Sequence, residues 1–211
     1  LQINRPKGPA FKPEELTLLQ GLASVVSVGL LASHRVAVER FRLNQLNLVR
    51  EVSAQIANAI SVTELSERVT ELIQKTFHYY YVAIFTVQDN SSSLRFRASA
   101  MPKGSRKGRR KKVALEVEIG QGLVGQAAAE GERIHVPDVQ KDTRYRFIDA
   151  LPETCSEVVI PLTIEGRVLG VLNVQSDKLN AFHPNDLLIL EALADTIARA
   201  VEGARLYSDL R

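Results

Sequence analysis

The sequence predicts a domain of the α+β class, in which an antiparallel sheet is preceded and followed by helices. The first observation is the stretch 156–176, SEVVIPLTIEGRVLGVLNVQS, where two β-branched runs flank Glu165-Gly166. This pattern is typical of an antiparallel hairpin at the centre of a sheet. The second observation is helical periodicity in the segments 62–77 and 184–210, on either side of the predicted strands.

Composition narrows the class of protein. A chain of 211 residues suits one medium-sized domain plus an appendage. The net charge is only +3, and much of the excess lies in the run 103–112, so we expect no nucleic-acid partner. The single cysteine, Cys155, excludes an intramolecular disulfide and fits a reducing, cytoplasmic location. Because no unbroken apolar stretch approaches about 18 residues, we expect no membrane span.

A repeat organises the chain. Residues 1–36 match residues 172–207 at a constant offset of 171, from Leu1 against Leu172 onward. The further identities pair Ala10-Phe11, Pro13, Leu16, Leu19 and Leu22-Ala23 with Ala181-Phe182, Pro184, Leu187, Leu190 and Leu193-Ala194. We therefore expect 1–36 to be the last strand and helix of an upstream domain, 37–60 a helical linker, 61–207 a complete domain and 208–211 the start of a downstream linker.

A long helical segment is predicted between the two copies. From Pro13 to about Ile60 there is no further proline, so the pattern favours one long helix, or two helices with a kink near Ser33-His34. Apolar residues recur there at three- and four-residue spacing, and we expect them to form the interface of a parallel homodimer: Leu43, Leu46, Val49, Val52 and Ile56.

The complete domain is predicted to begin with the helix 62–77, capped by Thr63. Aromatic and β-branched residues predict a strand at 79–88, and clean alternation predicts a more exposed one at 94–101. A third strand is expected at 113–119, after the basic loop.

In the second half of the domain, short predicted elements precede the hairpin and the last helix. Glycines at 120, 122 and 125 lead into a short helix at 123–130, and 134–136 forms a brief strand. Residues 142–151 are expected to form a short helix or an irregular lid. The hairpin and the helix 184–210 complete the domain.

Strand parity places polar side chains on one face of the hairpin. Glu157, Asn173 and Gln175 share that face, whereas Val158 and Ile160 point to the other. If elements of the domain cover the polar face, these side chains need partners, and a ligand is one candidate.

Three segments together resemble a GAF domain: GQGLVGQAAAEGERIHVPDVQKDTRY, the hairpin, and AFHPNDLLILEALADTIARAVEGARLY. The resemblance covers about 45–207. It implies a GAF/PAS-like central antiparallel sheet of five or six strands. The first and last helices would cover one face, and short helices and loops would enclose a small-molecule pocket on the other.

The expected pocket residues come from strand parity and from the lid. By parity they are Tyr81, Phe85, Cys155, Glu157, Asn173 and Gln175, and the lid adds Tyr145, Phe147 and Ile148. Alternatively these side chains pack on one another and the pocket is vestigial.

The residues present do not match the motifs of several more specific functions. Gly120-x-Gly122-x-x-Gly125 follows a strand outside any βαβ unit, so it indicates a turn and not a dinucleotide site. Cyclic-nucleotide-binding GAF domains carry Asn-Lys where Gln175-Ser176 stands, and bilin-binding ones commonly have His after the cysteine, where Ser156 stands. The histidines lack partners at metal-ligand spacing. We therefore name no cofactor and no metal.

The chain resembles one group of enzymes with this fold more closely. Free methionine-sulfoxide reductases use a Glu in an SE-I/V-V-x-P segment, which Ser156-Glu157 match. They have two acids where Asn173 and Gln175 stand and a Trp where Tyr81 stands. Their chemistry uses one cysteine to attack the sulfoxide and another to resolve the sulfenic acid, and Cys155 is alone.

The sequence therefore favours a non-catalytic small-molecule-sensing and dimerisation module, tandem GAF domains of a multidomain cytoplasmic signalling protein. Pocket occupancy would be relayed through the terminal helices to an output domain of the same polypeptide. The alternative is a structural connector with an empty pocket. A sulfoxide reductase comes third, because of the single cysteine.

Overall fold

The computed structural model describes residues 11–32, 61–88, 91–102 and 116–209. The chain divides into two compact units, Leu1–Asn47 and Leu48–Arg211. The predicted dimer stripe Leu43–Ile56, the predicted kink near Ser33 and the basic loop 103–112 lie outside the described residues. The parallel homodimer therefore stays a prediction.

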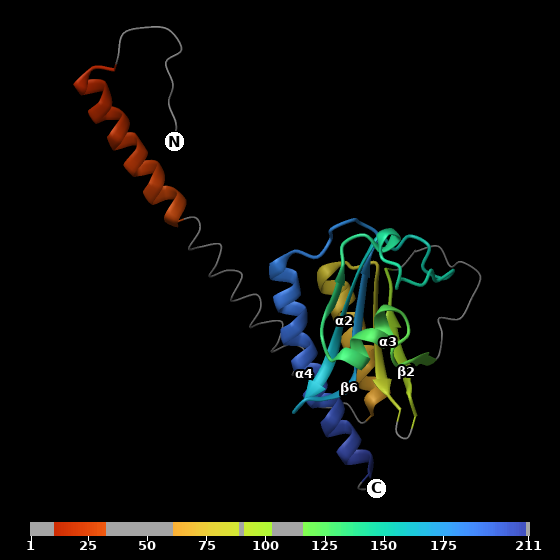
Figure 1. Cartoon of the computed structure of the whole chain (residues 1–211). Coiled ribbons are helices and arrows are strands. Elements are labelled where there is room, and N and C mark those ends of the chain that lie inside the picture. The colour runs from red at the N-terminus through yellow and green to blue at the C-terminus, as the bar shows by residue number, and fades with distance from the viewer. Residues whose placement is uncertain (1–10, 33–60, 89–90, 103–115, 210–211) are drawn as a thin grey trace. The chain divides into compact units, whose positions relative to one another are not determined.

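The second unit is built on one antiparallel sheet, as predicted. Its six strands lie in the order β3-β2-β1-β6-β5-β4 (Figure 1). The strands are β1 Tyr81–Val87, β2 Ser93–Ala100, β3 Glu116–Glu118, β4 Ile134–Val136, β5 Ser156–Ile164 and β6 Arg167–Ser176. Since β6 lies between β1 and β5, the predicted hairpin is indeed central, and the α+β prediction is confirmed.

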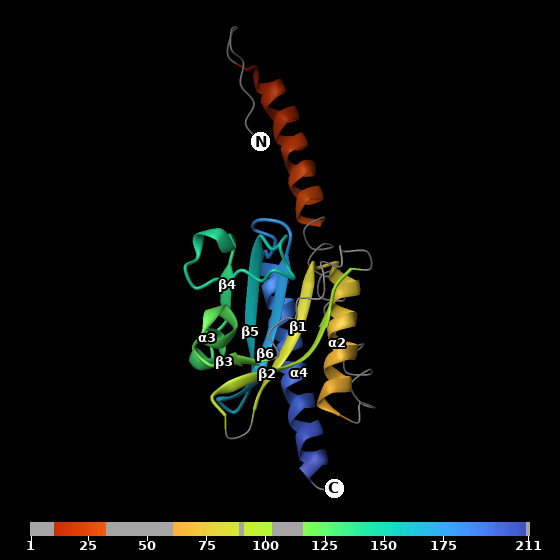
Figure 2. The same cartoon turned by 90° about the vertical axis from the view of Figure 1, so that its right-hand side faces the viewer.

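Helices cover both faces of this sheet. They are α2 Val62–Phe77, α3 Gly122–Glu130 and α4 Pro184–Asp209, with a short 3₁₀ turn, η1, at Val139–Lys141. Figure 2 shows α2 and α4 on one side of the sheet and α3 on the other. Residues 142–151 form no helix and run as an irregular segment, which we call the lid.

Ser61, and not Thr63, caps α2. The extended backbone of Ser61 lets its hydroxyl accept a hydrogen bond from the Glu64 amide at 3.2 Å. Thr63 already lies within the helix, so the predicted cap was two residues late. The helix ends at His78, whose φ of 57° is left-handed.

The turn between β5 and β6 sets the register of the hairpin. Glu165 and Gly166 have φ of 49° and 79°, and two successive positive values are what a tight two-residue hairpin turn requires. This register pairs Glu157 with Gln175 and Val159 with Asn173. The same parity therefore holds on both strands, as predicted.

The sheet buries both of its faces. Val82, Ile84 and Leu172 are completely buried, and strand alternation places them opposite to Tyr81 and Phe85, on the face that α2 and α4 cover. On the other side Tyr81 and Phe85 belong to a second apolar cluster under α3 and the lid. Because both faces are covered, Glu157, Asn173 and Gln175 on the central strands are removed from water.

The helix Pro13–Ala32 belongs to the first unit. Among the described residues it alone is long and apolar enough to cross a membrane by length and composition. We expected no such segment because no unbroken apolar run in the sequence approaches about 18 residues, whereas this helix is apolar on average over its length. A core helix of a globular domain can have the same length and composition.

Two glycines test how closely β6 approaches β1. A Cβ on Gly170 would lie 2.2 Å from the Phe85 carbonyl oxygen, whereas a Cβ on Gly203 in α4 would meet nothing within 4 Å. We predict that Gly170→Ala lowers the free energy of unfolding by about 1–3 kcal/mol through overpacking. The control Gly203→Ala should raise it by about 0.5–1 kcal/mol through helix propensity. Urea unfolding measures both, and equal effects would contradict this packing.

Candidate functional site

Polar residues form a row across three strands on the α3 side of the sheet. Gln175 of β6 pairs with Tyr81 of β1 on one side and with Glu157 of β5 on the other. Asn173 lies two residues before Gln175, so its side chain shares the face. Each of the four is at most 3% exposed. Paired residues have Cβ atoms about 4.5–5.5 Å apart, which places these groups within reach of one another.

The row is only partly satisfied by hydrogen bonds. Asn173 Nδ2 donates to Glu157 Oε1 at 3.0 Å, and Thr154 Oγ1 donates to Gln175 Oε1 at 2.7 Å. Asn173 Oδ1 and Gln175 Nε2 have no partner among the described residues. The Tyr81 hydroxyl lies near Ser99 without a hydrogen bond of good geometry. Buried polar groups that lack hydrogen-bond partners lower the stability of the fold, and a bound molecule can supply those partners.

A cavity of about 330 Å³ opens over this row. Glu157 and Asn173 contribute to its wall from the sheet, and Tyr145, Arg146 and Ile148 contribute from the lid. The rest comes from β3 and the start of α3: Glu116, Val117, Glu118, Gln121, Gly122, Leu123 and Val124. The volume lies at the lower end of the range for ligand pockets, so it suits a molecule of amino-acid size.

The structure brings together some of the predicted pocket residues. Glu157, Asn173, Tyr145 and Ile148 line the cavity. The other five do not: Tyr81, Phe85 and Gln175 are buried in the sheet, Cys155 is half-buried, and Phe147 is 65% exposed. The prediction for Phe147 is wrong because the lid is irregular, so neighbouring residues do not share one face.

Sequence reasoning missed the contribution of β3 and the start of α3. Its signal was the glycine pattern, since Gly120 and Gly122 have φ of 88° and 64°. A Cβ on Gly125 would lie 2.2 Å from the Glu118 carbonyl oxygen, so only glycine lets α3 approach β3 this closely. The glycines therefore make a tight turn, as predicted, and that turn forms one wall of the cavity.

Glu157 has the most perturbed acid–base behaviour at the site. Its complete burial raises the pKa of the carboxyl from 4.5 to about 8, against the opposing hydrogen bond from Asn173. Nearby Asp142 raises the pKa further. At neutral pH most of the carboxyl is therefore protonated, and it can donate a proton or a hydrogen bond to a ligand.

Cys155 lies at the entrance to β5, two residues before Glu157. Its amide donates to the Ser176 carbonyl at 2.8 Å, and its carbonyl accepts from the Val139 amide at 3.0 Å. The backbone is therefore held in strand pairing, which puts Cys155 on the face of Glu157. Burial raises the pKa of the Tyr145 phenol, and Glu157 and Cys155 both lie close enough to raise it further.

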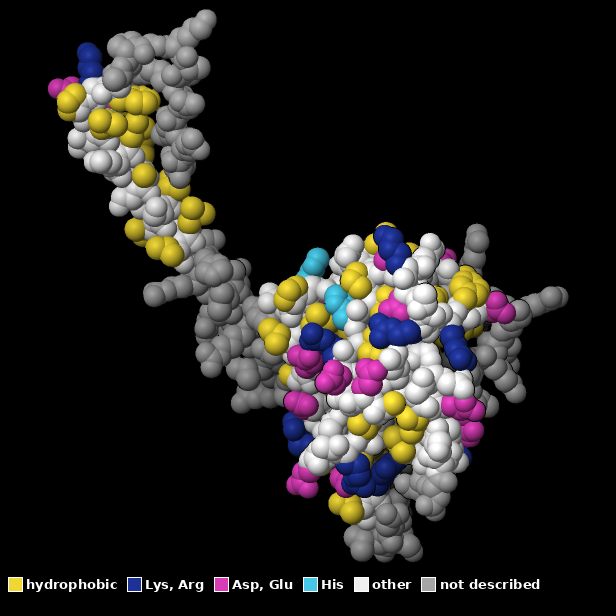
Figure 3. All heavy atoms as spheres, in the orientation of Figure 1, with side chains coloured by type: hydrophobic (Ala, Val, Ile, Leu, Met, Phe, Trp, Pro, Cys, Tyr) yellow, Lys and Arg dark blue, Asp and Glu magenta, His cyan; other side chains and the backbone are white. Residues whose placement is uncertain are grey.

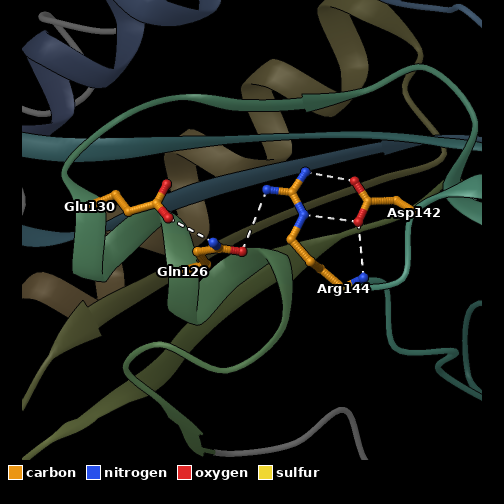
Figure 4. A network of polar contacts seen from close by, with 4 residues as sticks. All are labelled: Gln126, Glu130, Asp142 and Arg144. Carbon is orange, nitrogen blue, oxygen red and sulfur yellow. Dashed lines mark hydrogen bonds and ion pairs between the residues drawn. The ribbon is translucent and has the colours of Figure 1, made fainter.

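Arg144 connects the lid to α3 (Figure 4), and Arg146 connects it to the residue that precedes α3. Arg144 donates through Nε and Nη2 to the Asp142 carboxylate at 2.9 and 2.6 Å, and through Nη1 to Gln126 Oε1 at 3.5 Å. Gln126 in turn donates to Glu130 at 2.6 Å. Two residues along, Arg146 Nη1 donates to Gln121 Oε1 at 3.0 Å. These contacts hold Tyr145 and Ile148 over the cavity.

A family model for the GAF domain matches residues 59–202, which include the whole sheet, α2, α3 and most of α4. The chain belongs to the GAF domain family. GAF domain-containing protein A of Dictyostelium discoideum is 30% identical over 132 residues, which cover 63% of this chain and 72% of that protein. The resemblance seen in the sequence is thereby confirmed.

Two further comparisons concern enzymes of this fold. A free methionine-R-sulfoxide reductase of Saccharomyces cerevisiae is 35% identical over 91 residues, covering 42% of this chain and 49% of the enzyme. The reductase of Neisseria meningitidis, solved in complex with its substrate, aligns with a TM-score of 0.66 at 23% identity. That alignment covers 77% of this GAF domain chain and 90% of the reductase.

These reductases contradict our expectation that the domain is non-catalytic. The expectation relied on counting cysteines, and that count bears only on the step that resolves the sulfenic acid. The attack on a sulfoxide uses one thiol, and the sequence contains one cysteine, Cys155. The buried acid of the SEVVIP segment is also present, as Glu157.

The lid contacts can be tested by amide hydrogen exchange. We predict that Arg144→Gln speeds exchange of the amides in 142–151 by about 2–5-fold, because a partly exposed ion pair contributes up to about 1 kcal/mol. The control is Arg133→Gln, which removes the ion pair to Glu191 away from the lid. If both variants leave lid exchange unchanged, Arg144 does not fasten the lid.

Burial of Glu157 also predicts how stability depends on pH. Between pH 4.5 and about 8 the native state holds a proton that the unfolded state has lost, so stability decreases as pH rises through this window. One such group gives a slope of at most about 1.4 kcal/mol per pH unit. Glu157→Gln should remove this slope in urea unfolding at pH 5, 6.5 and 8. Identical slopes in the parent and the variant would show that the carboxyl titrates normally.

Proposed function

We propose that this GAF domain reduces a small sulfoxide, of the free methionine sulfoxide type, in the cavity beneath the lid. One observation carries the proposal. Glu157 is a buried, largely protonated carboxyl that lines a cavity of amino-acid size. It lies in a segment that resembles the SE-I/V-V-x-P segment of free methionine-sulfoxide reductases. The yeast and Neisseria reductases add support from sequence and from fold.

The first chemical step needs one thiol and one acid. The Cys155 sulfur attacks the sulfoxide sulfur while Glu157 gives its proton to the sulfoxide oxygen. The sulfur–oxygen bond of the substrate breaks, and the oxygen ends on the Cys155 sulfur. The products are the sulfide and the sulfenic acid of Cys155, and the proton of the thiol replaces the one that Glu157 gave. Two electrons pass from the cysteine sulfur to the substrate sulfur.

The second step uses a thiol from outside residues 1–211, because these residues contain only one cysteine, Cys155. One thiol condenses with the sulfenic acid, forming a mixed disulfide and releasing water. A second thiol displaces Cys155 and leaves as the disulfide of the reductant. The sum is sulfoxide plus two thiols giving sulfide, disulfide and water. A cytoplasmic location, where such thiols stay reduced, suits this chemistry.

The lid controls access to the thiol in this proposal. Cys155 does not line the cavity, but it lies close to Tyr145, which does. Displacement of Tyr145 when substrate enters would open a path from the sulfoxide to the Cys155 sulfur. The lid contacts are exposed hydrogen bonds and ion pairs, so this movement costs little.

Two residues differ from those of the reductases, and we expect this difference to change the affinity for the substrate. Asn173 and Gln175 stand where those enzymes have two acids. An amide oxygen accepts a hydrogen bond from an ammonium group but lacks the full charge of a carboxylate. We therefore expect Asn173 Oδ1, which has no partner among the described residues, to hold the amino group of the substrate less tightly than an acid does.

A steady-state assay tests the proposed function. With free methionine (R)-sulfoxide and dithiothreitol, the chain should form methionine at a rate that falls above pH 8, as Glu157 loses its proton. Cys155→Ser should abolish the activity, and Glu157→Gln should lower kcat by about 10²-fold. Arg133→Gln, remote from the cavity, is the control that should keep full activity. Binding without turnover, or a fully active Cys155→Ser variant, would overturn the proposal.

A further inference from the structure

We propose that the helix Pro13–Ala32 is the C-terminal helix of a second GAF-type unit. Its apolar face would dock on the antiparallel sheet of that unit, contributed by chain N-terminal to the helix. The partner surface is thus an apolar sheet face of β-branched and leucine side chains, like the one that α4 covers in this domain.

The two helices begin in the same way. The Lys12 amide donates to Glu15 Oε2 at 2.9 Å, and the His183 amide donates to Asp186 Oδ2 at 2.9 Å. Both pairs are related by the offset of the repeat. The first helical hydrogen bond follows at the equivalent position in each helix, with N–O distances of 3.0 and 3.1 Å. The sequence repeat therefore corresponds to a repeated local structure.

The buried face of α4 recurs on the helix Pro13–Ala32. Six of the buried α4 residues are Leu187, Leu190, Leu193, Ala194, Ile197 and Val201. Their equivalents, 171 positions earlier, are Leu16, Leu19, Leu22, Ala23, Val26 and Leu30. Four of the six are identical, and the other two are aliphatic. A helix that must fit the same kind of sheet needs the same sizes in the same places.

In α4 this face is covered, and in Pro13–Ala32 it is exposed. The α4 residues pack against β5 and β6, and Leu190 and Leu193 are completely buried. By contrast Leu16, Leu22 and Leu30 are 47%, 53% and 66% exposed, and Figure 3 shows hydrophobic side chains at the surface of this helix. The covering surface of α4 identifies what the equivalent face is built to meet.

The details favour a sheet over a lipid bilayer. A membrane-spanning helix needs only apolar length and has no reason to retain Ala23 at the position of Ala194. It also has no reason to follow a Phe11 equivalent to Phe182, which packs on Tyr79 with ring centroids 5.4 Å apart. Residues 1–11 match 172–182, so strand and loop sequence precedes the helix in the same order as in the complete domain. That order places the remainder of the second unit N-terminal to the helix.

A graft in the full chain tests the proposal. Residues 184–203 are replaced by the sequence of residues 13–32, which puts Leu16 at the position of Leu187. The control graft has the same composition but is shifted by two residues, which turns the apolar face about 200° away from the sheet. We expect cooperative thermal unfolding of the in-register graft, with Tm lowered by no more than about 15 °C. The shifted graft should show no cooperative transition.

Other outcomes overturn the proposal. If both grafts fold alike, or if neither folds, the face of Pro13–Ala32 is not shaped for a GAF sheet. Flotation of the parent chain with phosphatidylcholine vesicles provides a separate readout, and we expect the chain to stay with the protein fraction. Co-flotation that Leu22→Asp abolishes would assign the helix to a membrane instead. None of these results depends on whether Cys155 reduces a sulfoxide.

Discussion

The site depends on the burial of one carboxyl group in a sheet that is covered on both faces. Glu157 lies on a central strand, so α3 and the lid remove it from water while the helix pair closes the opposite face. Removal from water favours the neutral acid, and the single hydrogen bond from Asn173 does not reverse this preference. The result is a proton donor that faces a small cavity at neutral pH. Moving Glu157 by one residue along β5 would turn it toward the helix pair and remove it from the site.

The rest of the domain positions this acid. The turn at Glu165-Gly166 sets the register that places Gln175 opposite Glu157. The close approach of α3 to β3, possible because residue 125 is glycine, supplies the facing wall of the cavity. The lid completes the enclosure through contacts that are weak enough to exchange. Rigid strands therefore hold the acid, while a loosely fastened segment controls entry, a division of roles that is common at ligand sites.

Regular elements were predictable from the sequence, and irregular ones were not. Alternation along β5 and β6 predicted that Glu157 and Asn173 share a covered face, because strand geometry has a period of two. The lid has no period, so nothing in the sequence distinguished the exposed Phe147 from Tyr145 and Ile148, which line the cavity. The cavity wall formed by β3 and α3 arises from tertiary packing between segments whose sequences do not by themselves indicate a binding site. The expectation of a non-catalytic domain relied on the single cysteine, but in sulfoxide reduction a second cysteine is needed only for an internal route of resolving the sulfenic acid.

We propose that Cys155 takes the oxygen of a sulfoxide with Glu157 as the acid. The most direct measurement is a single turnover without any reductant, in which free methionine (R)-sulfoxide is added to the reduced chain. We predict one equivalent of methionine per chain and a sulfenic acid on Cys155, trapped by dimedone and located by mass spectrometry. No methionine, or methionine without a modified Cys155, would contradict the account.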